Sequence, residues 1–140
     1  MICIQETQIL NLTKYAEIEY PSECCGLIIG RGDQDNLIID EIIPSPNIAK
    51  GDTSTLFEID PQIRLNTQRR LRGSPQRVIG HFHSHPDASP WPSPTDLSKA
   101  FETELIWVIV SVKNGVANEI RMYRLDINHD QFCEINYKVN

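Results

Sequence analysis

The segment Gly80-His81-Phe82-His83-Ser84-His85-Pro86 places three histidines at alternate positions of one short stretch. Side chains on a β-strand alternate between its two faces, so residues two apart point the same way. The apolar pattern around the histidines predicts a strand over residues 77–85. His83 and His85 would then present two imidazoles side by side. Imidazole nitrogen is a preferred ligand of zinc, at about 2.0–2.1 Å.

A third ligand is expected downstream, in Ser93-Pro94-Thr95-Asp96. A carboxylate oxygen from Asp96 can complete a set of three protein ligands, which leaves a fourth position for water and distinguishes a catalytic zinc from a structural one. The same four residues also fit a capping box at a helix start without any metal. His81, on the same strand face, is an alternative third imidazole, or a residue that packs or hydrogen-bonds beside the site.

Outward from this strand, helical and extended patterns alternate along the chain. Asp60 is placed to cap a helix that has Pro61 at its first position. The predicted elements are a helix over 5–20, paired strands over 24–30 and 37–43, a loop over 44–54, a helix from 60 to 73, the histidine strand, a helix from 93 through 101, a buried central strand over 105–112, a strand over 120–125 and a last strand near 132–137. Interleaved strands and helices around one sheet predict an α/β (α+β) fold.

Composition narrows the classes of partner and compartment. The 140 residues carry a net charge of −6 and are expected to form a single domain, 1–140. Phosphate backbones require clustered positive charge, so nucleic acid is not an expected partner. The sequence has no apolar span of membrane length and no signal-peptide pattern at its start. The four cysteines show no C-x-x-C spacing, and we expect free thiols in a reducing cytoplasm.

A hydrolytic zinc also needs a group that moves the proton of its water. Glu23, where the first predicted helix has ended and an apolar strand begins, is the candidate acid/base. Ser93 can offer a hydroxyl beside the metal. Cys24 and Cys25 could instead act as thiol nucleophiles, but neither has the neighbouring cation that would lower its pKa, so the sequence favours buried thiols.

Taken together, Glu23, His83-x-His85-Pro86 and Ser93-x-x-Asp96 resemble the signature of the JAMM (MPN-plus) zinc isopeptidases. The stretch from Pro21 to Leu27 is typical of the short prokaryotic members. The resemblance implies a JAMM/MPN fold: a central curved mixed sheet flanked by about three helices and related to cytidine deaminases. It also implies roles, in which His83, His85 and Asp96 bind one zinc ion, Glu23 is the general acid/base and Ser93 stabilises the oxyanion.

The resemblance further implies an activity and a partner. The substrate would be a ubiquitin-like or sulfur-carrier protein, cut at an amide bond at its C-terminal Gly-Gly end. Two other interpretations stay open: a zinc-containing module that binds ubiquitin-like proteins without catalysis, and a peptidase related to phage tails or cell walls. A deaminase is disfavoured because the H-x-E and P-C-x-x-C motifs of that chemistry are missing. The sequence leaves monomer and dimer equally open.

Overall fold

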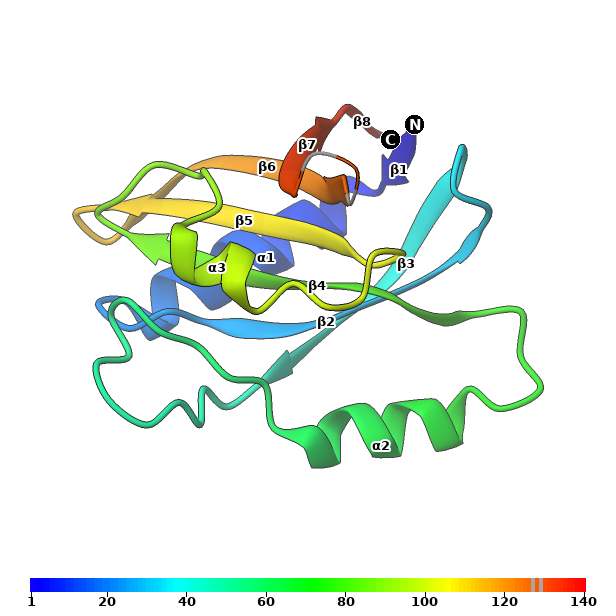
Figure 1. The fold of residues 1–140 in the computed structure, drawn as a ribbon, viewed down its shortest axis with the longest axis horizontal. Coiled ribbons are helices and arrows are strands. Elements are labelled where there is room, and N and C mark those ends of the chain that lie inside the picture. Colours follow the sequence, from blue (N-terminus) through cyan, green and yellow to red (C-terminus); the bar gives the residue numbers. More distant parts are fainter. Residues whose placement is uncertain (127, 129) are drawn as a thin grey trace.

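The computed structural model describes residues 1–126, 128 and 130–140. Within this part of the chain, the strands form one mixed sheet with helices on both of its faces (Figure 1). In chain order the elements are β1 (Ile2–Ile4), α1 (Glu6–Glu19), β2 (Cys25–Gly32), β3 (Leu37–Ser45), α2 (Pro61–Arg70), β4 (Arg77–Pro86), α3 (Pro94–Ser98), β5 (Ile106–Lys113), β6 (Val116–Asp126), β7 (Gln131–Ile135) and β8 (Tyr137–Val139).

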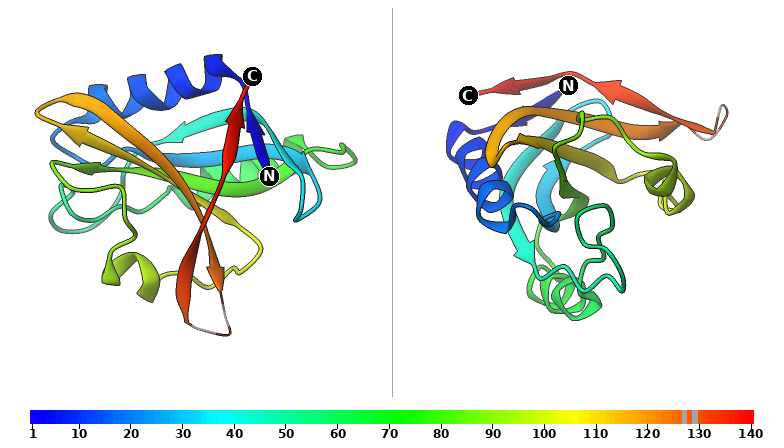
Figure 2. Two further views of the ribbon diagram at one scale, coloured as in Figure 1. Left: turned by 90° about the horizontal axis from the view of Figure 1, so that it is seen from above. Right: turned by 90° about the vertical axis from the view of Figure 1, so that its left-hand side faces the viewer.

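The strand order in the described sheet is β7-β6-β5-β4-β2-β3-β1-β8. β4, the histidine strand, is antiparallel to β2 and parallel to β5, so it is central and paired on both edges. β7 and β8 follow each other with only Asn136 between them, yet they pair with opposite ends of the sheet. The sheet must curl for one extended segment to reach both ends, as Figure 2 shows. The predicted curved mixed sheet is confirmed.

The two faces of the sheet have different roles. On one face, α1 buries Leu12 and Ala16 against apolar side chains of the strands, including Phe82 of β4. The opposite face carries α2 and α3, which lie across the sheet from α1 in the right-hand view of Figure 2. Because β4 alternates, Phe82 points to α1 while the flanking His81 and His83 point to the α2 and α3 side. The histidines therefore line the face that the main core leaves free.

Most predicted elements are present. Two have other bounds: α2 ends at Arg70 where the sequence predicts 73, and β6 begins at Val116 where it predicts 120. The third helix ends at Ser98 instead of Phe101, because the N–H groups of Lys99 and Ala100 bond to carbonyls three residues back and Phe101 is 83% exposed, so burial does not favour extending the helix. The predicted last strand is two strands, β7 and β8. β1 was not predicted, because three residues are too few to show a period.

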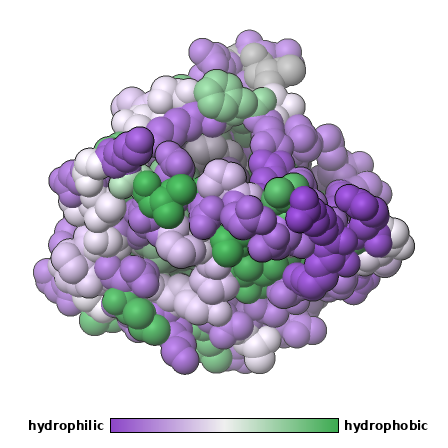
Figure 3. All heavy atoms as spheres, turned by 90° about the horizontal axis from the view of Figure 1, so that it is seen from below, coloured by the Kyte–Doolittle hydropathy of each residue, from purple (hydrophilic) through white to green (hydrophobic). Residues whose placement is uncertain are grey.

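The surface carries both hydrophilic and apolar side chains. In the view of Figure 3, hydrophilic side chains cover most of the molecule and apolar ones form small separate groups. No helix among the described residues has the length and apolar character to cross a membrane. All four cysteines are free, as predicted; Cys24 and Cys25 are buried, and Cys133 is exposed. That residues 1–140 form one whole domain stays a prediction.

Candidate metal centre

The two imidazoles predicted from the alternation of β4 do meet. His83 is fully buried and His85 is 7% exposed. Their Nε2 atoms lie 3.0 Å apart. The Oδ2 atom of Asp96 lies 3.2 Å from the His83 Nε2 and 3.3 Å from the His85 Nε2. The ligand atoms of His83, His85 and Asp96, the three ligands proposed from the sequence, therefore lie close to one another.

Asp96 is aimed at the histidines by the start of α3. The Ser93 Oγ accepts a hydrogen bond from the Asp96 N–H at 3.0 Å, and the Ser93 N–H donates to Asp96 Oδ2 at 2.9 Å. This reciprocal pair is a capping box. Because the box fixes the rotamer of the Asp96 carboxylate, the helix-start interpretation and the ligand interpretation of this motif describe the same geometry.

The tautomer of His85 is set by a backbone carbonyl. Its Nδ1 lies 2.8 Å from the Ser89 oxygen. A carbonyl oxygen only accepts, so Nδ1 carries the hydrogen and, in the neutral ring, Nε2 presents a lone pair. That lone pair points to the same place as the Asp96 carboxylate. An arrangement of converging electron pairs is one that a cation satisfies.

Glu23 reaches the cluster from the start of β2. Its N–H donates to the Thr53 carbonyl at 2.7 Å, and its own carbonyl accepts from the Asn47 side chain at 3.0 Å. The next residue is tied to β4, because the Cys24 N–H donates to Ser84 Oγ at 2.8 Å. These bonds hold the Glu23 side chain over the histidines, where it is 4% exposed.

Glu23, His83 and His85 form a group in which the candidate ligand atoms all lie within 4.8 Å of one another. The Glu23 Oε1 atom is buried and has no hydrogen-bond partner among the described residues, and the same holds for the His83 Nδ1 atom. A buried carboxylate oxygen without a partner is costly in a folded protein. Its presence beside the converging ligands marks a place where a cation, a water molecule or a substrate completes the structure.

Burial and hydrogen bonds set the charges of these groups in the metal-free protein. Burial raises the pKa of Glu23 to about 8. Burial also lowers the pKa of His83. For Asp96 burial acts in the raising direction, but hydrogen bonds from His83 and from the Ser93 N–H outweigh it, and the pKa of its carboxyl is lowered. For His85 burial acts in the lowering direction, but its contacts with Asp96 and the Ser89 carbonyl outweigh it and raise its pKa; when the ring is protonated, its Nε2–H donates to Asp96 as well. The site therefore holds an ionised aspartate beside a neutral His83.

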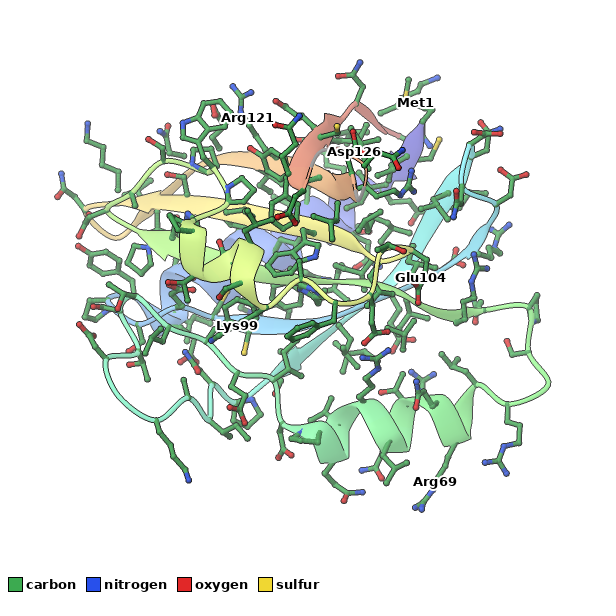
Figure 4. All side chains as sticks on the ribbon, viewed as in Figure 1. Met1, Arg69, Lys99, Glu104, Arg121 and Asp126 are labelled. Carbon is green, nitrogen blue, oxygen red and sulfur yellow. The ribbon has the colours of Figure 1, made fainter. Side chains whose placement is uncertain are left out.

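Aromatic rings enclose the cluster, and the sequence did not reveal this wall. Phe57, from the segment before α2, stacks on His83 with ring centroids 4.2 Å apart. Trp107 of β5 meets the edge of His81, with ring centroids 4.3 Å apart. His81 is outside the candidate ligand group and packs against these rings, which is the packing role that the sequence allowed for it. Lys99 follows α3 at the rim (Figure 4), with Nζ 5.9 Å from the Phe57 centroid.

The spacing of the ligand atoms matches what a small cation requires. Four ligands placed tetrahedrally at zinc distances are about 3.3 Å from each other. The three measured separations among His83, His85 and Asp96 are 3.0, 3.2 and 3.3 Å. The residues present therefore fit a metal ion, and the cluster can hold one.

Comparison with known proteins assigns the chain to a protein family. A family model described as prokaryotic homologs of the JAB domain matches residues 6–126. The chain belongs to this family. The resemblance to the short prokaryotic JAMM/MPN proteins, first seen in the spacing of Glu23, His83, His85 and Asp96, is confirmed, and with it the assignment of the chain as a hydrolase.

Two curated relatives of this JAB-domain protein are similar over most of its length. A CysO-cysteine peptidase of Mycobacterium tuberculosis is 25% identical over 125 residues, which cover 89% of this chain and 83% of the relative. A desampylase of Haloferax volcanii is 27% identical over 119 residues, covering 85% of this chain and 79% of the relative. Both relatives are named as hydrolytic enzymes.

Solved structures confirm the fold. The solution structure of a Desulfitobacterium hafniense protein matches with a TM-score of 0.86 and 26% identity, covering 100% of this chain and 93% of that one. The crystal structure of a JAB1/MPN domain protein from Archaeoglobus fulgidus matches with a TM-score of 0.63 and 22% identity, covering 99% of this chain and 97% of that one. The predicted JAMM/MPN fold is thus the observed one.

Proposed function

We propose that this chain is a zinc-dependent peptidase or isopeptidase that hydrolyses an amide bond at the C-terminal Gly-Gly end of a ubiquitin-like or sulfur-carrier protein. The observation that carries the proposal is the convergence of His83, His85 and Asp96 beneath the buried Glu23 carboxyl. The four free cysteines are compatible with the cytoplasmic location that the sequence predicts.

His83, His85 and Asp96 would hold the zinc ion. Their ligand atoms lie at mutual distances of 3.0–3.3 Å, which suits direct ligation of one ion. The Glu23 carboxyl lies within 4.8 Å of the two histidine ligand atoms and has a buried oxygen without a partner among the described residues, so it can contact a water molecule that occupies the remaining position.

Glu23 would act as the acid/base. When bound, zinc supplies Lewis acidity and brings the pKa of a water molecule toward neutrality. Beside a cation the ionised form of the Glu23 carboxyl is favoured, so it can accept a proton from that water. The water oxygen then bonds to the scissile carbonyl carbon, the C–N bond breaks, and Glu23 returns the proton to the leaving amine.

Ser93 would stabilise the negative charge that develops on the attacked oxygen. Its Oγ accepts from the Asp96 N–H, and its own hydroxyl hydrogen is available for a further bond. Because the capping box fixes this hydroxyl within one helical turn of Asp96, it is held before the substrate arrives. Loss of one such donor typically costs ~3–4 kcal/mol of transition-state stabilisation.

The substrate class is the finer part of the proposal. The names of the two relatives, a CysO-cysteine peptidase and a desampylase, support a small carrier or modifier protein as the substrate. The Phe57 to Asp60 segment is the place where we expect an extended Gly-Gly tail to bind, since Phe57 stacks directly on His83.

The test pairs metal content with cleavage. Protein purified without added metal is analysed for zinc and incubated with a Gly-Gly-terminated sulfur carrier that bears a C-terminal amino acid, and separately with an isopeptide-linked conjugate. We expect about one zinc per chain, with cleavage that is lost on chelation and restored by zinc. Absence of zinc binding after reconstitution would contradict the ligand assignment. Stoichiometric zinc with no cleavage of either substrate would contradict the substrate assignment.

Two variants separate the acid/base from general effects. Glu23→Gln should retain zinc and lose at least about a hundredfold in turnover, because the positioned proton acceptor is gone. Glu104→Gln, which changes an exposed glutamate away from the cluster, should leave both unchanged. Unchanged turnover in Glu23→Gln would show that another group moves the proton.

A further inference from the structure

Two buried hydroxyl groups hold the loop that orients His85. The loop runs from Asp87 to Trp91, between β4 and α3, and its Ser89 carbonyl accepts the His85 Nδ1 hydrogen at 2.8 Å. The carbonyls on either side of Ser89 are also occupied. Ser111 Oγ donates to the Ala88 oxygen at 2.6 Å, and Tyr123 Oη donates to the Pro90 oxygen at 2.5 Å.

Each of these two hydroxyls belongs to a side chain that is buried among apolar or aromatic residues. β5 is apolar from Ile106 to Val112 except for Ser111, which is 5% exposed and pairs directly with His85 in the β4–β5 register. Tyr123 of β6 is 4% exposed, and its ring packs with Trp107 and Phe132 while its hydroxyl reaches the loop. A buried hydroxyl costs free energy unless it has a partner, and here the partners are loop carbonyls.

The start of the loop is fixed as well. The Asp87 carboxylate accepts from the Tyr20 hydroxyl at 2.6 Å and from the Asn114 N–H at 2.8 Å. Trp91, at the far end, stacks with the guanidinium of Arg121, whose Cζ lies 4.4 Å from the Trp91 ring centroid; Figure 4 labels Arg121. The Ser89 carbonyl is therefore held between anchored neighbours.

We propose that Ser111 and Tyr123 are positioning residues for His85: by holding the Ala88 and Pro90 carbonyls, they keep the Ser89 carbonyl on His85 Nδ1 and so keep Nε2 as the atom that faces the metal site. Their hydroxyls bond to these two loop carbonyls and to none of the three proposed ligands. The inference rests on the proposed function only in so far as it assigns His85 to a metal.

The first readout needs no metal. In metal-free protein, the ¹⁵N chemical shifts of the His85 imidazole are followed with rising pH until they stop changing, and the final shifts report which nitrogen of the neutral ring carries the hydrogen. The unsubstituted protein should show the Nδ1–H tautomer. Tyr123→Phe and Ser111→Ala should each show a mixture of both tautomers, because the carbonyl is no longer fixed. A structural role elsewhere in the sheet would not change this ratio.

The second readout is zinc affinity, measured by competition with a chromophoric chelator. Partners of metal-binding histidines typically contribute ~10–100-fold to affinity. Since these hydroxyls act through one further bond, we expect about a tenfold weaker zinc affinity in each variant. The matched control is Tyr137→Phe, which removes a hydroxyl that donates to the Ile120 carbonyl at 2.8 Å, away from the loop. It should change neither readout.

The outcomes are separable. If both variants keep the pure Nδ1–H tautomer, the positioning role is wrong, whatever happens to zinc affinity. If the tautomers mix but zinc affinity is unchanged, the link from loop to metal is wrong. If the unsubstituted protein binds no zinc, the proposed function fails and the tautomer experiment still decides the positioning role. Amide spectra of each variant establish that it is folded.

Discussion

The buried carboxyl of Glu23 should make the stability of the metal-free protein depend on pH. Burial raises its pKa from 4.5 to about 8. Between these values the group is ionised in the unfolded chain and protonated in the folded protein, so the unfolded state binds fewer protons. The free energy of unfolding therefore falls as pH rises: the contribution is fully present below pH 4.5 and is lost as pH rises through 8.

The magnitude follows from the two pKa values. At pH 7, ionisation of Glu23 in the unfolded chain alone would remove about 3 kcal/mol of stability, and at pH 5 less than about 1 kcal/mol. Solvent at the edge of the site screens the charge, so we expect a difference of about 2 kcal/mol between the two pH values. Glu23→Gln keeps the shape of the side chain and cannot titrate. The variant should therefore gain about 2 kcal/mol relative to the unsubstituted protein between pH 5 and pH 7.

Urea unfolding in the presence of EDTA at pH 5, 6, 7 and 8 measures this difference. The other groups of the cluster are common to both proteins, so subtraction isolates Glu23. Glu104→Gln, at an exposed position, is the control and should differ from the unsubstituted protein by less than about 0.5 kcal/mol at every pH. A stability difference for Glu23→Gln that stays constant within about 0.5 kcal/mol from pH 5 to 8 would refute the reasoning.

Three other perturbations have defined outcomes. Burial raises the pKa of Cys24 to about 11 and that of Cys25 to about 12. Iodoacetamide at pH 7.5 should therefore label the exposed Cys133 and leave Cys24 and Cys25 unlabelled until urea is added, as peptide mass mapping would show. Rapid labelling of Cys24 or Cys25 in the folded protein would contradict the prediction that these two thiols are unreactive. Gly26→Ala would place a Cβ on a backbone oxygen of β3 and should lower Tm by about 10 °C or more. Gly73→Ala has free space around the new Cβ but a φ of 79°, so it should lower the free energy of unfolding by only about 1 kcal/mol. Equal melting temperatures for the two variants would show that the sheet relaxes around the added methyl group. Zinc at a hundredfold excess over its Kd should raise the free energy of unfolding by ~2.7 kcal/mol in a manner reversed by EDTA, and superimposable denaturation curves would argue against binding to the folded state.

Local rules account for the parts of the site that lie close together in the sequence. Alternation along β4 puts His83 and His85 on one face, and the capping box of Ser93 and Asp96 fixes a carboxylate at a helix start. Both are properties of a few consecutive residues with a known period. The same holds for the buried central strand β5, whose run of apolar residues predicts burial on both faces.

The prediction of Glu23 had a different basis. Nothing in its neighbourhood distinguishes it from an exposed glutamate, and its place in the site came from the resemblance to a family. The contact depends on the β2–β4 register, in which Cys24 and Ser84 bond to each other across sixty positions of sequence. Register between distant strands is a property of the whole sheet and has no local signal.

The sequence by itself determined which ligands are available and that two of them share a face, because side-chain direction within one strand or helix turn follows from backbone geometry. Only the tertiary structure decided which groups contact these ligands. The Phe57 ring stacks on His83, the Ser89 carbonyl bonds to His85, and the Ser111 and Tyr123 hydroxyls bond to the carbonyls on either side of Ser89. Backbone carbonyls are the same in every residue, so their hydrogen-bond partners become visible only when the sheet has brought distant strands together.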